Sequence, residues 1–310
     1  MPKAYVFTRY GGPETEALVD LDRPRPGPGE VLVAVRAAGV NPVDWKQRTG
    51  YRRPGESGER VFPSVLGNEV SGVVEESGEG VTGFAPGDEV FGTAVAGGYA
   101  EYALLAAGIT AHKPAGLSFT DAATLPVAAA TAYDGVHQLD LPAGATLLVT
   151  GAGGGVGVAV AQIARARGLR VVGVASEGKK GLVESLGAVH VPSGPDWAAA
   201  VRRAAPEGVD GVYDLVGGEV LHEAAGLVRD RTRLITAGAP AEEVERLGGA
   251  RVARARDTAV LRAVADLVVR GGLNPQVTLT FPLERAGEAL REVESGHARG
   301  KVVLEIGADA

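Results

Sequence analysis

The stretch 145–175 constrains the fold more than any other part of the chain. An apolar run over 147–149 predicts a buried strand, which passes directly into glycines at Gly151, Gly153, Gly154, Gly155 and Gly157. An apolar-periodic segment over 158–167 predicts a helix that ends at Gly168, and Leu169–Ala175 reads as a second strand. This order predicts a βαβ unit with two parallel strands.

The turn between the first strand and the helix has the composition of a diphosphate site. Glycines let a ligand approach the backbone, and a helix N-terminus offers unpaired N–H groups with a partial positive charge. The spacing departs from G-x-G-x-x-G: with Gly157 as the last glycine, Gly154 takes the second position and Ala152 the first. A plain tight turn is the alternative. We predict a dinucleotide held by Ala152, Gly153, Gly154, Gly155, Val156 and Gly157.

The residues after the second strand bear on which dinucleotide binds. An NAD site usually has Asp or Glu there for the ribose 2′-hydroxyl, whereas this strand ends at Ser176, followed by Glu177, Lys179 and Lys180. A hydroxyl and a lysine suit a 2′-phosphate, which needs donors and positive charge. The sequence therefore favours NADPH, bound by Ser176 and Lys180. An inward-pointing Glu177 would favour NADH instead, and lysines are also common at a solvated helix start.

Composition excludes several classes of protein. The 310 residues include no cysteine, which excludes disulfides, thiolate catalysis and cysteine-bound zinc. A net charge of −7 argues against nucleic acid or anionic membranes as partners. No apolar run approaches the ~20 residues of a membrane span, and the first residues do not resemble a signal peptide. The length suits two domains, and we expect a cytoplasmic protein.

The pattern of predicted secondary structure changes near residue 120. Residues 1–115 contain short strand-like runs between Gly/Pro turns, which indicates a barrel or sandwich, with 46–62 as a surface loop. Residues 121–135 read as a helix, after which strands and helices alternate to residue 237, which indicates a parallel sheet. A capped helix over 257–270 and a strand–helix–strand tail follow, and the tail is placed to rejoin the first domain.

Several motifs, in order along the chain, resemble those of the zinc-free medium-chain dehydrogenases/reductases of the quinone oxidoreductase type. They are Ala38-Gly-Val-Asn-Pro-Val-Asp44, Gly67-Asn-Glu-Val-Ser-Gly72, Pro86-Gly-Asp-Glu-Val-Phe-Gly92, Gly97-Gly-Tyr-Ala-Glu-Tyr102, Leu125-Pro126 with Thr131-Ala132, the turn Ala152–Gly157, and Gly300-Lys-Val-Val-Leu304. The resemblance implies a Rossmann domain (a doubly wound parallel sheet, α/β) over 120–273. It implies that this domain is inserted into a GroES-like β-barrel domain made of 1–119 and 274–310.

The chain also differs from zinc-dependent and from some NADPH-dependent relatives at positions that bear on metal and cofactor binding. Zinc-dependent relatives have a catalytic Cys where this chain has Val40, and a His-Glu pair where it has Asn68-Glu69. The resemblance therefore implies no metal. Some NADPH-dependent relatives have a Tyr against the 2′-phosphate where this chain has Gly194, which leaves Ser176 and Lys180 to bind that group.

The resemblance also implies candidate residues for catalysis. Nicotinamide supplies the hydride, and hydrogen-bond donors must stabilise the negative charge on the substrate oxygen. Asn41 and Asp44 lie in the motif that faces the nicotinamide, Thr131 in the motif that contacts its carboxamide, and Gly238 ends the fifth strand. Lys46, Arg52 and Asn41 are candidate donors and Tyr51 a candidate proton donor, from a loop that varies among relatives. Alternatively, Asn41 is a turn residue, Asp44 a helix cap, Thr131 a core hydroxyl, and Lys46, Tyr51 and Arg52 solvent-facing.

The leading hypothesis is an NADPH-dependent reductase of quinones or α,β-unsaturated carbonyls that works without metal. The motifs do not separate it from a pathway-specific enoyl or ketone reductase, nor from a non-catalytic NADP(H)-binding sensor or structural protein. The substrate itself is not encoded in any motif, because the loops 46–62 and 239–256 decide it. The resemblance further implies a homodimer that acts on a small-molecule substrate.

Overall fold

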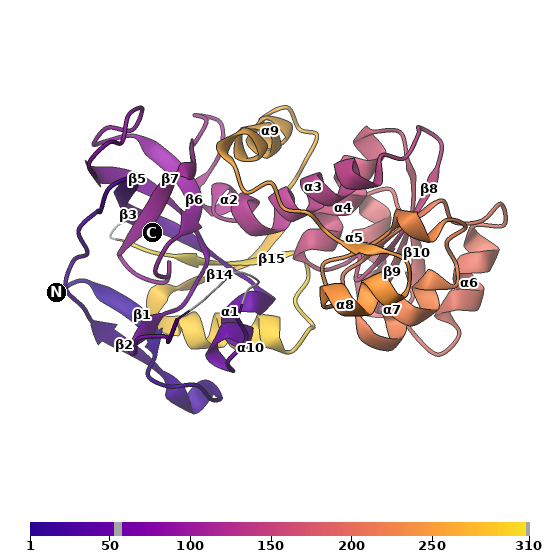
Figure 1. The fold of residues 1–310 in the computed structure, drawn as a ribbon, viewed down its shortest axis with the longest axis horizontal. Coiled ribbons are helices and arrows are strands. Elements are labelled where there is room, and N and C mark those ends of the chain that lie inside the picture. The colour runs from indigo at the N-terminus through magenta and orange to yellow at the C-terminus, as the bar shows by residue number, and fades with distance from the viewer. Residues whose placement is uncertain (53–57, 308–310) are drawn as a thin grey trace. The chain divides into compact units, whose positions relative to one another are not determined.

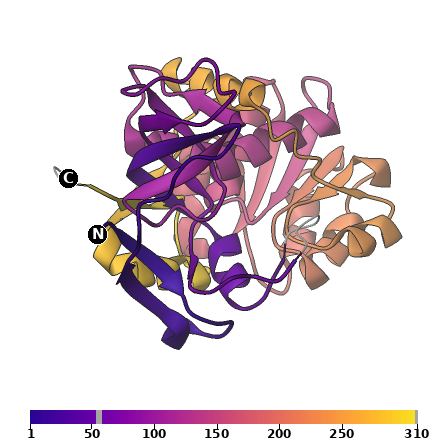
Figure 2. The ribbon, with the colours of Figure 1, turned by 60° about the vertical axis from the view of Figure 1, so that its left-hand side comes forward.

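The computed structural model describes residues 1–52 and 58–307, and the chain forms two compact units. The first unit comprises Met1–Val127, Arg256–Val269 and Val277–Ala310, and the second comprises Ala128–Ala255 and Arg270–Gln276. Figures 1 and 2 trace the return of the C-terminal segment, coloured yellow, to the unit formed by the N-terminal strands. The expected return of the tail to the first domain is thus present.

The first unit contains a sheet that closes on itself. Its order is β14-β15-β3-β5-β6-β7, and a further pairing joins β7 back to β3, so that β3, β5, β6 and β7 form a closed barrel. The strands are β3 (Glu30–Val40), β5 (Glu69–Ser77), β6 (Glu89–Ala94), β7 (Tyr102–His112), β14 (Val277–Pro282) and β15 (Lys301–Glu305). A small sheet, β2-β1-β4, consists of β1 (Lys3–Phe7), β2 (Glu16–Asp20) and β4 (Ser64–Val65). The barrel alternative of the sequence prediction is the one observed.

Apolar side chains from distant strands fill the interior of the first unit. Val33 on β3, Val70 and Val74 on β5 and Leu304 on β15 are at most 1% exposed. Their alternation along each strand places one set of side chains inside the barrel. The helix α10 (Ala286–Glu294), preceded by a 3₁₀ turn at Leu283–Arg285, adds Ala289 and Leu290 to the same core.

The prediction of a surface loop over 46–62 is wrong for residues 46–48. Helix α1 (Pro42–Arg48) covers residues 46–48, and Arg48 is only 1% exposed. Its guanidinium donates to Glu16 and to Glu294, the latter at 2.9 Å, and its Nε donates to the Gly11 carbonyl. A polar run predicts exposure, but an arginine is readily buried where carboxylates from other elements satisfy it. Residues 53–57 lie outside the described part of the chain.

The second unit is a doubly wound parallel sheet, as predicted. The order β10-β9-β8-β11-β12-β13 is 3-2-1-4-5-6 in chain order, the arrangement of a dinucleotide-binding fold. The strands are β8 (Thr146–Thr150), β9 (Arg170–Ala175), β10 (Val189–Pro192), β11 (Gly211–Asp214), β12 (Leu234–Thr236) and β13 (Ala250–Arg251). The helices are α3 (Ala130–Leu139), α4 (Gly155–Ala166), α5 (Lys180–Ser185), α6 (Trp197–Ala204), α7 (Gly218–Ala225) and α8 (Ala241–Arg246). The strand order reverses between β8 and β11, the usual ligand position in such sheets.

The boundaries of the two units differ from the predicted 120–273 at three places: residues 120–127 and 256–269 belong to the first unit, and residues 274–276 belong to the second. Helix α9 (Thr258–Val269) belongs to the first unit, where Thr258 Oγ1 donates to the carbonyls of Gly108 and Thr110, both at 3.0 Å. Asp257 caps the helix, accepting from Val260 N at 2.8 Å. Helical periodicity identifies the buried face of α9, but it contains no information on which sheet that face meets.

The predicted helix over 121–135 is broken. The chain forms α2 (Phe119–Ala122), a π-helical segment at Leu125–Ala129, and then α3. Pro126 lacks an amide proton and cannot continue a regular α-helical ladder. The N-terminal part of the first unit ends at Val127, within this segment. In residues 1–52 and 58–307, no helix is long and apolar enough to span a membrane.

Candidate active site

Asp44 is the centre of a buried hydrogen-bond network in the first unit. Its side chain is 0% exposed and accepts hydrogen bonds from Asn41 N at 2.8 Å, from Tyr99 OH at 2.7 Å and from Asn68 Nδ2. The bond to Asn41 N caps the first turn of α1, which is the capping role that the sequence left open. Because both oxygens are enclosed by protein donors, Asp44 is suited to holding α1 in place rather than to touching a substrate.

The electrostatics of this carboxyl follow from its enclosure. Burial raises the pKa of Asp44 to about 6, while the hydrogen bonds from Tyr99, Asn41 and Asn68 oppose the increase. Burial, together with the neighbouring Asp44 charge, raises the pKa of Tyr99 well above its usual value. Tyr99 therefore remains a protonated donor at neutral pH.

Asn41 is fixed by a buried ion pair. Its Nδ2 donates to Glu69 Oε1 at 2.7 Å, and its Oδ1 accepts from Lys301 Nζ at 2.7 Å. Lys301 Nζ also donates to Glu69 Oε1 at 2.9 Å, and Val127 N donates to Glu69 Oε2 at 2.7 Å. The amide of Asn41 is thus oriented from both ends.

Tyr99 and Lys301 are among the members of this network that were not predicted as site residues. Both lie in motifs that carry the family resemblance, but a motif does not reveal which side chains meet. Lys301 is 3% exposed and comes 232 positions after Glu69. A single lysine at the start of an otherwise apolar strand is the local signal that could have found it, since such a residue needs a buried partner.

The other predicted catalytic residues lie outside this network. Lys46 is half-buried with its ammonium 5.6 Å from the centroid of the Trp45 ring, and Tyr51 is 38% exposed. Arg52 is exposed and donates to the Gly58 carbonyl. The solvent-facing alternative therefore describes the surroundings of Tyr51 and Arg52 in this structure.

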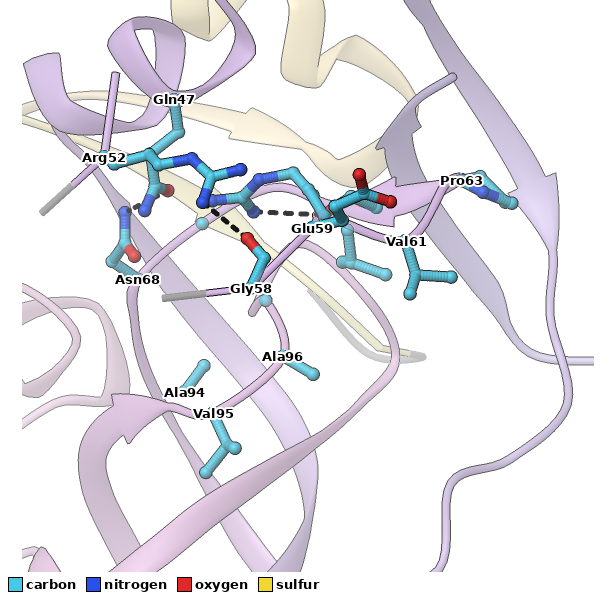
Figure 3. Close-up of a pocket in the computed structure, with 15 residues that line it drawn as sticks. Gln47, Arg52, Gly58, Glu59, Val61, Pro63, Asn68, Ala94, Val95 and Ala96 are labelled. Carbon is cyan, nitrogen blue, oxygen red and sulfur yellow. Dashed lines mark hydrogen bonds between the residues drawn. The ribbon is translucent and has the colours of Figure 1, made fainter. Parts of the chain in front are cut away.

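A cavity of about 470 Å³ adjoins the network in the first unit (Figure 3). Gln47 and Asn68 form one wall, where Asn68 Nδ2 donates to Gln47 Oε1 at 3.3 Å, and Arg52 lies beside them. The strand end and loop at 94–97 supply an apolar wall with small side chains. The cavity is lined by amide, guanidinium and carboxylate side chains together with this apolar wall.

Two glycines in the turn of the second unit differ in the free space around them. Gly154 is the N-cap of α4, and a Cβ there would meet only Gly151 O, at 3.4 Å. A Cβ at Gly157 would lie 2.6 Å from the Ala152 Cα, so Gly157 is required by the packing of the turn itself. The first backbone N–H groups of α4 lack helical partners by geometry. The turn therefore fits a diphosphate that approaches at Gly154.

The residues after β9 have different surroundings. Ser176, Glu177 and Lys180 are exposed, whereas Lys179 is half-buried. A Cβ at Gly153 would lie 2.6 Å from the Lys179 Cδ, so the stem of Lys179 covers that glycine. Lys179 therefore lies nearer the turn, and Lys180 belongs to the first turn of α5.

Thr131 and Gly238 each have a role within the second unit. The Thr131 carbonyl accepts from Tyr213 OH at 2.7 Å, and its Oγ1 accepts from Arg254 Nη1 at 2.5 Å. A Cβ at Gly238 would lie 2.7 Å from the Val216 nitrogen, so glycine there permits the loops after β11 and β12 to approach closely.

Comparisons with known proteins agree with this architecture. The family model of the alcohol dehydrogenase GroES-like domain matches residues 27–115, and that of the zinc-binding dehydrogenase domain matches residues 186–304. The chain is 33% identical to a quinone oxidoreductase of Rattus norvegicus, over 95% of each protein. The solved quinone oxidoreductase from Coxiella burnetii matches with a TM-score of 0.91 and 29% identity over 99% of both chains. A mycobacterial protein complexed with NADPH matches with a TM-score of 0.86 and 29% identity, over 98% of this chain and 100% of that one.

A GroES-like barrel joined to a Rossmann sheet with a glycine turn at β8 defines an oxidoreductase of the kind that binds a nicotinamide cofactor. The chain belongs to the medium-chain dehydrogenase/reductase family, as a quinone oxidoreductase-like member.

The residues at the position of the family's catalytic zinc do not fit that metal. Val40 offers no ligand, the Asn68 amide donates to Asp44 and Gln47, and the Lys301 ammonium beside Glu69 would repel a divalent cation. Across 1–52 and 58–307, no group of three or more His, Cys, Asp or Glu side chains is arranged to hold a metal.

Proposed function

We propose that this protein is an NADPH-dependent reductase that transfers a hydride to a quinone or an α,β-unsaturated carbonyl compound without a metal. The observation that carries the proposal is the turn at 151–157, which is open at Gly154 and leads into the N-terminus of α4. The quinone oxidoreductase relatives support the substrate class, and the NADPH complex of the mycobacterial protein supports the cofactor.

The proposed cofactor contacts follow from the sequence motifs. We assign the diphosphate to the turn from Ala152 to Gly157 and the 2′-phosphate to Ser176 and Lys180. Thr131, Gly238 and Asn41 are the proposed contacts of the nicotinamide half. NADPH supplies the hydride when it is bound, and the chain contributes orientation and electrostatic stabilisation.

The cavity beside Asp44 is the proposed substrate site. The Gln47 amide and the Arg52 guanidinium line it and can donate to the substrate oxygen, where negative charge develops. Asn41 and Asp44 keep α1, and with it Gln47, in position. Lys46 and Tyr51 remain candidate donors, with Tyr51 the candidate for the proton.

A titration tests this proposal. NADPH and NADH are titrated separately while nicotinamide fluorescence is followed, and 1,4-benzoquinone is then added, with metal content measured on the same sample. We expect tighter binding of NADPH, oxidation when the quinone is added, and no stoichiometric zinc. A preference for NADH would mean that Glu177 holds the ribose, and one zinc per chain would overturn the metal-free mechanism.

The same titration separates the alternatives. Tight binding without oxidation by quinones or simple enals would favour a pathway-specific enoyl or ketone reductase, or a non-catalytic NADP(H)-binding protein. A panel of enoyl and keto substrates then distinguishes these two, because only the reductase turns over with one of them.

A further inference from the structure

Asp214, the last residue of β11, is a fully buried carboxylate with no role in the site described above. It accepts a hydrogen bond from Thr150 Oγ1 at 2.6 Å and another from Thr236 Oγ1 at 2.6 Å. Its own loop adds backbone donors, with Gly217 N at 3.0 Å from Oδ2 and Val216 N at 3.2 Å from Oδ1. Four donors therefore converge on one carboxylate.

The two hydroxyls extend these bonds to the neighbouring loops. Thr150 Oγ1 accepts from Leu215 N at 3.1 Å. Thr236 Oγ1 accepts from Gly238 N at 2.9 Å and from Ala239 N at 3.1 Å. The last residue of β8 and the segments that follow β11 and β12 are thus tied to one another through the Asp214 carboxylate.

These three strands are neighbours where a dinucleotide binds. The sheet order places β11 between β8 and β12, and the reversal of strand order falls between β8 and β11. Thr150 directly precedes the glycine turn. In folds of this kind the adenosine ribose is bound at the end of the second strand, here β9, so the other half of the dinucleotide would extend over the ends of β11 and β12.

Only an ionised carboxylate satisfies this set of donors. A hydroxyl has a single proton to donate. The oxygens of Thr150 and Thr236 each accept from a backbone N–H, and their own protons are donated to Asp214. An asparagine of the same shape would direct an NH₂ group at one of these donors. A buried charge is costly, so its presence here points to a requirement for four acceptor positions.

We propose that Asp214 is a positioning residue of the cofactor site, which fixes the loops after β11 and β12 against the end of β8 for the nicotinamide half of the dinucleotide. This inference rests on the proposed function only in that a nicotinamide dinucleotide is the ligand. It predicts that the loss of the carboxylate affects one half of the cofactor and not the other.

The test compares whole dinucleotides with their adenosine halves. The dissociation constants of NADPH, NADH, adenosine 2′,5′-bisphosphate and 5′-AMP are measured by calorimetry on the full chain and on Asp214→Asn. We expect the variant to bind the preferred dinucleotide about tenfold more weakly or worse, as the loss of a charged hydrogen bond implies. We expect the matching adenosine fragment to change by less than about twofold, because it contacts β8 and β9.

A core variant provides the stability control. Val201→Ala removes a buried side chain from α6 in the same unit and should lower the melting temperature while leaving both ligands bound as before. If Asp214→Asn does not fold, Thr236→Val removes one of the two hydroxyls and should give the same split between dinucleotide and fragment.

Each outcome has a distinct meaning. Unchanged binding of the dinucleotide, or equal weakening of dinucleotide and fragment, would overturn the positioning role. A wild-type preference for NADH would overturn the NADPH assignment alone, and the comparison would then be read with NADH and 5′-AMP. Failure of the wild type to bind either dinucleotide would overturn both this inference and the proposed function.

Discussion

At the scale of the residue, the first unit buries charges and amides that hold one another in place. Asp44, Asn41, Glu69 and Lys301 are each at most 4% exposed, and every one of them accepts or donates a hydrogen bond within the group or to its neighbours. Buried polar groups are tolerated only when they are satisfied in this way. Removal of one member therefore affects stability as well as the geometry of the site.

The first prediction concerns pH. Because the folded state raises the pKa of Asp44 from 3.8 to about 6, the folded protein retains a proton that the unfolded chain releases between these values. The contribution of Asp44 to stability is thus complete below pH 4 and falls by about 3 kcal/mol as the pH rises to 6. Urea unfolding of wild type and Asp44→Asn at pH 4 to 7 should show the difference in unfolding free energy shifting in favour of the variant as the pH rises. A difference that is flat across this range would contradict the prediction.

The second prediction concerns the lysines after β9. Lys180→Ala should weaken NADPH more than NADH, by about 1–2 kcal/mol, if a charge-assisted bond to the 2′-phosphate is lost. Lys179→Ala is the matched control: its stem covers Gly153 in the turn, so we expect it to affect both dinucleotides alike. Fluorescence titration measures both effects. Equal weakening by Lys180→Ala would show that this lysine does not contact the 2′-phosphate.

At the scale of the element, we expect substitutions at two glycines of the turn before α4 to affect ligand binding and folding separately. Gly154→Val should abolish dinucleotide binding with a small effect on melting temperature, because a side chain there enters the space that the diphosphate needs. Gly157→Val should lower the melting temperature itself, because its Cβ would press on Ala152. Calorimetric titration and thermal unfolding measure the two quantities. Retained affinity in Gly154→Val would mean that the ligand does not approach at this glycine.

Helix α1 shows how an element gains a role beyond its sequence signal. Asn41 before Pro42 predicts a turn, and the turn is the start of a helix that places Gln47 in the wall of the cavity. Arg48 at its end is held by carboxylates from β2 and α10. The helix is therefore fixed at both ends by side chains that come from other parts of the first unit.

At the scale of the whole molecule, the expectation of a homodimer rests on the family resemblance. Sedimentation equilibrium at micromolar concentration should give twice the 31.6 kDa of one chain. The measurement is repeated with NADPH, because a ligand that binds the folded state also stabilises the form that binds it. A monomer mass in both conditions would refute the expectation.

The sequence by itself determined the features that depend on local order along the chain. The alternation of strands and helices after residue 145 predicted the parallel sheet, which the structure confirms, and the glycine turn predicts where a dinucleotide binds. The absence of cysteine excluded thiolate chemistry, and Val40 with Asn68 argued against the family's zinc. These inferences are possible from sequence because periodicity and spacing are properties of neighbouring residues.

The tertiary structure alone decided which distant residues meet. It placed Lys301 against Glu69 and Tyr99 against the buried Asp44. It also brought the ends of β8, β11 and β12 together through hydrogen bonds to Asp214. It also assigned α9 to the first unit and buried Arg48 between two carboxylates. Such contacts depend on how sheets close and which faces pack together, and a local pattern of side chains specifies the face but not its partner.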